Sequence, residues 1–182
     1  MNDSIDIITI ERDCDAILIP SGDPIKLIKG THVRITQALG GDYTLFVNGN
    51  LVKISGEDAD VIGKKPIIIK KIDNNNSGEP IKEDDVWEQL KTVYDPEIPV
   101  NIVELGLIYD LKINDDDDGS FVQIKMTLTA PGCGMGPVIA QDAEQKVKTL
   151  QGVKDVLVEI VWEPLWNRDM MTDEAKLQLG MM

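Results

Sequence analysis

The sequence predicts an α+β protein made of two modules. A small all-β module, barrel- or sandwich-like, is expected at residues 1–72, a linker at 73–80 and an α+β module at 81–182. Apolar residues alternate in short, strand-like runs in the first half of the chain, whereas helical spacing appears only in the second half. The stretch between them, IDNNNSGEP at residues 72–80, is polar, rich in turn-forming residues and without apolar periodicity, which is typical of a linker.

The charge of the chain is unevenly divided between the two modules. Residues 1–79 carry 12 acidic and 9 basic side chains, whereas residues 80–182 carry 20 acidic and 9 basic ones. The second part therefore has a net charge of −11, against −3 for the first. Because nucleic-acid binding needs a basic face, the total of −14 argues against it and favours basic protein partners.

The composition is typical of a cytoplasmic protein with no membrane association. No apolar run has the length of a membrane span, and the start of the chain, MNDSIDIITIERDCD, is acidic, unlike a secretory signal. Cys14 and Cys133 are too far apart for a CxxC metal knuckle, and we expect both to be reduced thiols. Cys14 lies in the acidic stretch ERDCD, which disfavours a thiolate, so we expect it to be chemically passive.

Short β-like runs recur through the first module. We expect strands at residues 16–19, 33–36, 43–47, 51–54 and 67–69, and no helix. The strongest local signal is YTLFV-NG-NLVKI, because Asn48-Gly49 tolerates the positive φ angles of a type I′ hairpin turn. The only histidine, His32, is expected at the surface, at the end of a strand.

The second module begins with a helix and a hairpin. Val86, Leu90 and Val93 share one helical face, and Pro96 predicts that the helix ends near Tyr94. Alternating apolar residues then predict strands over residues 105–113 and 122–129. The stretch NDDDDGS between them is a solvated turn without the spaced ligands of a calcium loop.

A second helix and a third strand complete the second module. Pro137 suits the first helical position, and Ile139, Ala143 and Val147 form a buried stripe. Gly152 ends this helix, and alternation from 156 to 162 predicts a strand. The order is α-β-β-α-β, in which the helices cover one face of a small sheet.

Cys133 lies in a glycine-rich loop, APGCGMGP, just before the second helix. The positive end of a helix stabilises a thiolate, which is both a nucleophile and a soft metal ligand. Glycines let another molecule approach closely. The supporting residues of this loop are Thr129, Gly132, Gly134 and Gly136.

The residues of the module exclude several kinds of site. The loop GCGMG is neither a dinucleotide-binding nor a Walker motif, and a Cys–His dyad is excluded because the module has no histidine. One cysteine cannot complete a closed zinc or four-thiolate iron–sulfur site. Any cluster bound here is therefore labile, shared across a dimer or partly ligated by carboxylates.

Two further segments supply candidate site residues. Asp95 and Glu97 flank Pro96, and they are either partners of Cys133 or local caps of a solvated turn. In the tail WEPLWNRDMMTDEAKL, Trp162 and Trp166 are expected to close the edge of the sheet. Arg168 and Trp166 are candidate partner contacts, and Thr172 is a candidate cap of a short final helix.

Three blocks of the second module together resemble a known family. DPEIPVNIVELGLIYDL, TLTAPGCGMGP and VEIVWEPLW, in this order, resemble the SufT/PaaD-type iron–sulfur assembly domain over residues 80 to about 172. The β-rich module followed by this domain also resembles the SufT-like arrangement. The resemblance implies an α+β fold and a role beside the SUF scaffold and desulfurase. It places the family's cysteine at Cys133 and its acidic block at Asp95 and Glu97.

We therefore expect an accessory factor in iron–sulfur cluster assembly or delivery, not an enzyme. Cys133 is expected to ligate a cluster or its iron transiently, with no organic cofactor. The expected partners are SUF assembly proteins, apo iron–sulfur clients and, for a shared cluster, a second copy of the chain. The alternative is an acidic adaptor that docks such proteins without ligating a cluster. A thiol enzyme would need a base or a second thiol beside Cys133, and the sequence shows neither.

Overall fold

The computed structural model describes residues 6–67 and 80–181. The chain divides into two compact units, Met1–Ile69 and Lys70–Met182, called here the first and second unit. The linker expected at 73–80 lies outside the described residues except for Pro80. No helix among the described residues is long and apolar enough to cross a membrane.

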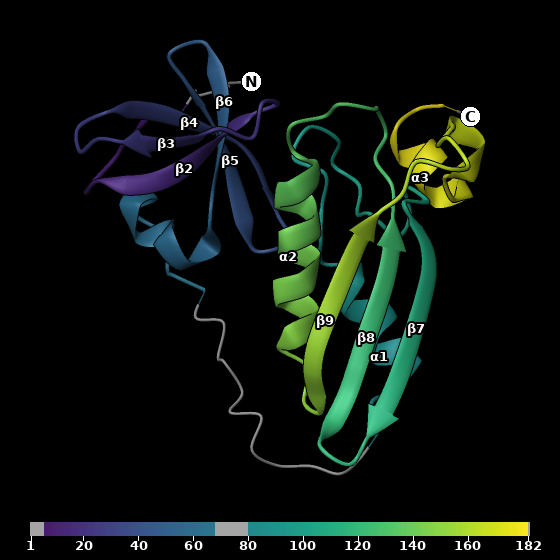
Figure 1. Ribbon diagram of the computed structural model, residues 1–182. Helices are drawn as coiled ribbons and strands as arrows, with labels where there is room; N and C mark the ends of the chain where they lie inside the picture. The colour runs from purple at the N-terminus through teal and green to yellow at the C-terminus, as the bar shows by residue number, and fades with distance from the viewer. Residues whose placement is uncertain (1–5, 68–79, 182) are drawn as a thin grey trace. The chain divides into compact units, whose positions relative to one another are not determined.

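The first unit contains one six-stranded antiparallel sheet, strongly twisted in Figure 1. The strand order across the sheet is β1-β4-β5-β6-β2-β3. The strands are β1 (Ile8–Thr9), β2 (Cys14–Ile19), β3 (Pro24–Leu27), β4 (His32–Leu39), β5 (Asp42–Val47) and β6 (Asn50–Ile54). The β5–β6 hairpin is confirmed: Val47 pairs with Asn50, and Asn48 and Gly49 have φ angles of 49° and 85°.

Sequence patterns missed three elements of the first unit. The edge strands β1 and β3 are too short for alternation to reveal, and a 3₁₀ helix, η1 (Gly56–Ile62), occupies a segment in which no helix was expected. The Ser55 hydroxyl caps η1 by accepting a hydrogen bond from the Glu57 backbone N–H. Ile67 belongs to no strand, and the rest of the strand expected at 67–69 lies outside the described residues.

The core of the first unit contains Cys14. This side chain is 4% exposed and packs among the aliphatic residues of the sheet. Burial raises the pKa of the Cys14 thiol, and the charge of Asp58 raises it further. Cys14 is therefore a core thiol, and its chemical passivity stays a prediction, while His32 is exposed at the start of β4, as predicted.

The second unit contains a three-stranded sheet with the order β7-β8-β9. Strands β7 (Ile108–Asp116) and β8 (Gly119–Met126) form an antiparallel hairpin with an aspartate tip, as predicted, and β9 (Val153–Ile160) pairs with β8 in parallel. The helices are α1 (Glu83–Leu90), α2 (Gly136–Lys148) and α3 (Asp173–Gln178), with a 3₁₀ turn, η2 (Arg168–Met170), before α3. The α+β class is confirmed.

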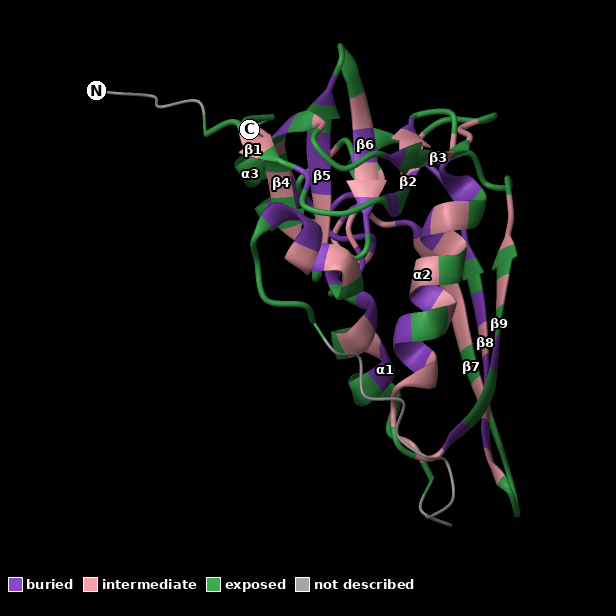
Figure 2. Ribbon diagram, turned by 90° about the vertical axis from the view of Figure 1, so that its left-hand side faces the viewer, coloured by how far each residue is buried: buried purple, intermediate pink, exposed green. Residues whose placement is uncertain are grey.

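Helices α1 and α2 lie on the same side of this sheet. Figure 2 views the sheet nearly edge-on and shows both helices on one side of β7, β8 and β9. Val122, Ile124 and Met126 of β8 alternate with less buried residues, and Ile139 and Val147 of α2 are also buried. The core of the unit therefore lies between the helices and one face of the sheet.

Two of the predicted boundaries that were wrong in the second unit lie between α1 and β7. Helix α1 ends at Leu90 rather than near Tyr94, because Tyr94 pairs with Asn101 and the Val93 carbonyl accepts from Ile102 instead of continuing the helix. The Thr92 hydroxyl and the Lys146 ammonium bind the carbonyls of Gln89 and Thr92 at the helix end. Strand β7 begins at Ile108 rather than at residue 105, because Leu105 is buried within a turn. Alternation alone does not distinguish such a buried turn from a strand.

Candidate functional site at one end of the sheet

The strand register brings three segments to one end of the three-stranded sheet. Met126, the last residue of β8, pairs with Ile108 at the start of β7 and with Ile160 at the end of β9. The segment 91–107 enters the sheet here, and the segments 127–135 and 161–181 leave it here. In Figure 1 this is the end of the sheet nearest α3.

The Cys133 loop begins earlier than predicted. Strand β8 ends at Met126 rather than Thr129, although Thr127 still donates its N–H to the carbonyl of Leu107. Thr127 and Leu128 are buried, so they anchor the start of the loop in the core, and Thr129 is the first partly exposed residue after them. The loop is thus tied to the sheet at its base.

The end of the loop leads directly into α2. Helix α2 begins at Gly136, and Pro137 occupies its second position. An ideal Cβ on Gly136 would lie 2.5 Å from Leu128 Cδ1, so this glycine permits close packing of the helix start against the base of the loop. Gly132 has a φ angle of 76° and space around it, whereas Gly134 is half-buried.

Cys133 lies between these two anchors and is partly exposed. Its carbonyl accepts a hydrogen bond of 3.2 Å from the N–H of Gly136, the first residue of α2. Met135, the residue directly before α2, is 1% exposed and fixes this part of the loop in the core. The loop therefore holds the Cys133 thiol near the surface on a backbone tied to the helix start.

Asp95 caps the turn that follows α1. The side chain is 8% exposed, and its Oδ1 accepts hydrogen bonds from the N–H groups of Glu97 at 2.9 Å and Ile98 at 3.0 Å. Burial raises the pKa of Asp95, and these two backbone hydrogen bonds oppose the rise. Of the two interpretations left open by the sequence, local capping accounts for these contacts.

Glu97 differs from Asp95 because its side chain is exposed. Within the described residues, no three His, Cys, Asp or Glu side chains form a group that could hold a metal ion. Cys133, Asp95 and Glu97 are therefore not gathered into a three-ligand site within one chain. Their part in binding a cluster stays a prediction.

The two tryptophans of the tail lie in different environments. The Trp166 indole N–H donates to the carbonyl of Leu105 at 2.7 Å, and this side chain is half-buried. Trp162 lies beyond the end of β9 and is 41% exposed, so the prediction that it closes the sheet as core was wrong. The Arg168 side chain is exposed at the start of η2.

Sequence reasoning missed that the tail packs on the segment 95–107. Thr172 donates its N–H to the carbonyl of Glu104, and the Gln178 side chain donates to the carbonyl of Pro99. Gly106 has a φ angle of 73°, and any Cβ there would overlap the backbone oxygen of Met170. Gly106, within the stretch VELGL, was the one sequence signal of this close approach.

The two thiols are expected to differ sharply in reactivity. In the native protein, a thiol reagent such as DTNB should modify Cys133 quickly and Cys14 only after unfolding, because Cys14 is in the core and Cys133 is partly exposed. The measurement is the rate of absorbance change with and without denaturant. The Cys133→Ser variant should lose the fast phase and Cys14→Ser should keep it, whereas a fast phase retained in Cys133→Ser would contradict the prediction.

This arrangement defines an α+β protein with one accessible thiol in a loop between a strand and a helix. Residues 83–160, which include α1, the Cys133 loop and β9, match the family described as iron–sulfur cluster assembly protein. The chain belongs to this family, and the resemblance to the SufT/PaaD-type domain is confirmed.

Individual relatives agree with this family. The chain is 49% identical over 98 residues to the Fe-S protein maturation auxiliary factor of Porphyromonas gingivalis, which covers 54% of this chain and 90% of the relative. It is 44% identical over 88 residues to the Fe-S protein maturation auxiliary factor SufT of Staphylococcus aureus, which covers 48% and 97%. A crystal structure of a domain of unknown function, DUF59, from Bacillus anthracis matches with a TM-score of 0.51 and 35% identity, covering 55% and 92%.

Proposed function

We propose that this protein is an accessory factor in iron–sulfur cluster assembly or in delivery of clusters to client proteins. Its family and the maturation-factor names of its relatives support this role. The observation that carries the proposal is the position of Cys133, the only cysteine of the family region, partly exposed in a loop anchored at both ends. The role is binding and transfer, without enzymatic turnover.

In this proposal the Cys133 thiolate is one ligand of a cluster that passes through the protein. A cluster needs several thiolates, and the second unit supplies one, so the other ligands come from the protein that delivers or receives the cluster. Glu97 is the more available carboxylate to assist, because its side chain is exposed, whereas Asp95 binds two backbone N–H groups. A site completed by the partner releases its cargo more easily than a closed one.

The partners that fit are SUF assembly proteins and apo iron–sulfur clients in the cytoplasm. The alternative function is an acidic adaptor that brings such proteins together without touching the cluster. The net charge of −11 over residues 80–182 favours this alternative as much as it favours docking during transfer. Removal of the thiol alone distinguishes the two functions.

Anaerobic reconstitution with iron and sulfide tests the role of Cys133. Wild-type protein is expected to gain the visible absorption of a labile cluster, and Cys133→Ser is expected to lose it, because serine removes the thiolate and keeps the size of the side chain. Cys14→Ser is the matched control, since that thiol is buried in the first unit. Equal uptake by wild type and Cys133→Ser, with equal maturation of a client protein, would leave only the adaptor.

A further inference from the structure

Residues 161–166 cross the end of the sheet and are held there by three hydrogen bonds. Val161 donates its N–H to the carbonyl of Met126 at 2.8 Å, and the Tyr109 hydroxyl donates to the carbonyl of Pro164 at 2.7 Å. The third is the hydrogen bond from the Trp166 indole to Leu105. The backbone of residues 161–166 is therefore held against β8, β7 and the turn before β7.

Two large apolar side chains lie exposed between these hydrogen bonds. Trp162 is 41% exposed and Leu165 is 65% exposed. Within the described residues no hydrogen bond uses the Trp162 indole N–H, which is thus available as a donor to another molecule. Tryptophan on a fixed backbone is a favoured anchor of protein interfaces, because little conformational entropy is lost when it is covered.

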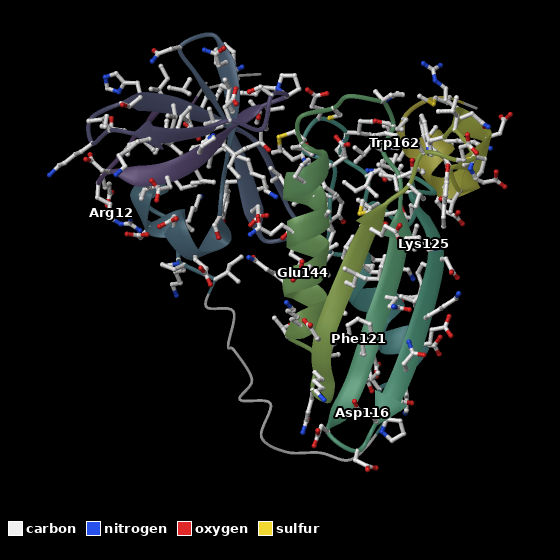
Figure 3. All side chains as sticks on the ribbon, viewed as in Figure 1. Arg12, Asp116, Phe121, Lys125, Glu144 and Trp162 are labelled. Carbon is white, nitrogen blue, oxygen red and sulfur yellow. The ribbon has the colours of Figure 1, made fainter. Side chains whose placement is uncertain are left out.

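Trp162 lies next to the base of the Cys133 loop. It follows Val161 directly, and Val161 is bonded to Met126, the residue at which β8 ends and the loop begins. Figure 3 shows Trp162 at this end of the sheet, between β9 and the tail. A protein that covers Trp162 therefore lies beside the base of the loop that carries Cys133.

The charges around the two side chains indicate the kind of partner. Glu159, Glu163 and Asp169 are exposed in this stretch of chain, and Arg168 is its only cation. On the neighbouring strand β8, exposed Lys125 pairs in register with Glu159. The carboxylates of Glu163 and Asp169 therefore face a partner beside a single arginine. A second copy of the chain would bring two such acidic surfaces together, with a net charge of −11 on each second unit. A surface with lysine or arginine around an apolar side chain complements this one in charge and in polarity.

We propose that Trp162 and Leu165 anchor a docking surface for a protein segment in which apolar side chains are flanked by basic ones. The surface holds that segment beside the base of the Cys133 loop. The inference rests on the proposed function for its purpose, since the bound protein would be a giver or receiver of the cluster. Docking itself does not require the thiol.

A binding experiment with the full chain tests this surface. The probe is a fluorescein-labelled synthetic peptide with a central pair of leucines flanked by lysines, followed by fluorescence anisotropy. Trp162→Ala and Leu165→Ser are each expected to weaken binding about tenfold. Leu157→Ala is the matched control, because Leu157 is 50% exposed on β9 and outside the surface, and it is expected to change affinity less than about twofold. Both surface variants remove exposed side chains, and circular dichroism checks that they are folded.

The outcomes separate this inference from the proposed function. A peptide with glutamates in place of lysines should not bind, and Cys133→Ser should bind the lysine peptide as wild type does. If the wild-type protein binds the peptide but takes up no cluster, the proposed transfer role is contradicted and the docking surface is still supported. The proposed docking surface is contradicted if the lysine peptide shows no saturable binding, or if Leu157→Ala weakens peptide binding as much as the two surface variants do. Concentration-dependent dimers in sedimentation, dissociated by Trp162→Ala, would assign it to a second copy and overturn the proposal.

Discussion

Gly106→Ala is expected to destabilise the second unit by about 2–4 kcal/mol, since two costs add at this position. A Cβ at Gly106 would overlap the backbone oxygen of Met170, and a backbone atom cannot move aside as a flexible side chain can. The φ angle of 73° is also unfavourable for alanine. Denaturant unfolding followed by tryptophan fluorescence measures the loss, because Trp166 lies on the contact that is disturbed.

Gly132→Ala is the matched control for Gly106→Ala. Gly132 has a similar φ angle of 76°, but nothing lies within 4 Å of the position that a Cβ would take. Its substitution should therefore cost only the backbone term, about 1 kcal/mol. The difference between the two variants measures the close approach of the tail to the segment 95–107. Equal losses would show that this approach contributes nothing to stability.

Asp95→Ala is expected to cost about 2 kcal/mol of unfolding free energy, because the Glu97 and Ile98 N–H groups lose their acceptor. Asp95→Asn keeps an oxygen at the same position and should stay within about 1 kcal/mol of wild type. Equilibrium unfolding of the three proteins measures both differences. If Asn is as destabilising as Ala, the cap is not the role of this side chain.

The difference in stability between wild type and Asp95→Asn is expected to depend on pH. Burial raises the pKa of Asp95 above its ordinary value of 3.8, so the folded protein holds this proton more tightly than the unfolded chain does. The resulting stability is fully present below 3.8 and is lost as the pH rises through the raised value. Relative to Asp95→Asn, wild type should therefore lose stability between acid and neutral pH. If the difference in unfolding free energy between wild type and Asp95→Asn stays constant over this pH range, the prediction is contradicted.

Asp95→Asn also separates capping from cluster ligation. If Asp95 acts only as a cap, the Asn variant should take up a cluster on reconstitution as wild type does. If its carboxylate binds iron, uptake should fall although the fold is kept. Asp95 and Cys133 thus have distinct signatures: substitution of Cys133 changes uptake alone, and Asp95→Ala changes stability.

Local sequence patterns predicted the hairpins and the helix faces correctly. Asn48-Gly49 and the aspartate-rich stretch before Gly119 each specify a turn by their own backbone preferences, and the strands on either side pair as expected. The stripe of Ile139, Ala143 and Val147 is buried in α2. In these cases the determining interactions lie within a few residues of chain.

Predicted boundaries failed where buried apolar residues, such as Val93 and Leu105, continue the apolar pattern outside the element. Helix α1 ends at Leu90, and beyond it Lys146, far along the chain, donates to the carbonyl of Thr92, while Ile102 donates to that of Val93. Leu105 alternates like a strand residue, but the Asn101 side chain caps the turn before it by accepting from the N–H groups of Val103 and Glu104. Trp162 was also predicted to be a core residue from its hydrophobicity, but its side chain is 41% exposed.

The sequence by itself determined the class of the protein, the position of Cys133 before a helix and the pairing of Asp95 with Glu97 around a proline, because each is a local arrangement. Only the tertiary structure decided that Asp95 binds backbone N–H groups while Glu97 is exposed. It also decided that the tail crosses the sheet end beside the Cys133 loop. The physical reason is that strand register and three hydrogen bonds between residues distant in the chain create this convergence, and no short-range pattern encodes them.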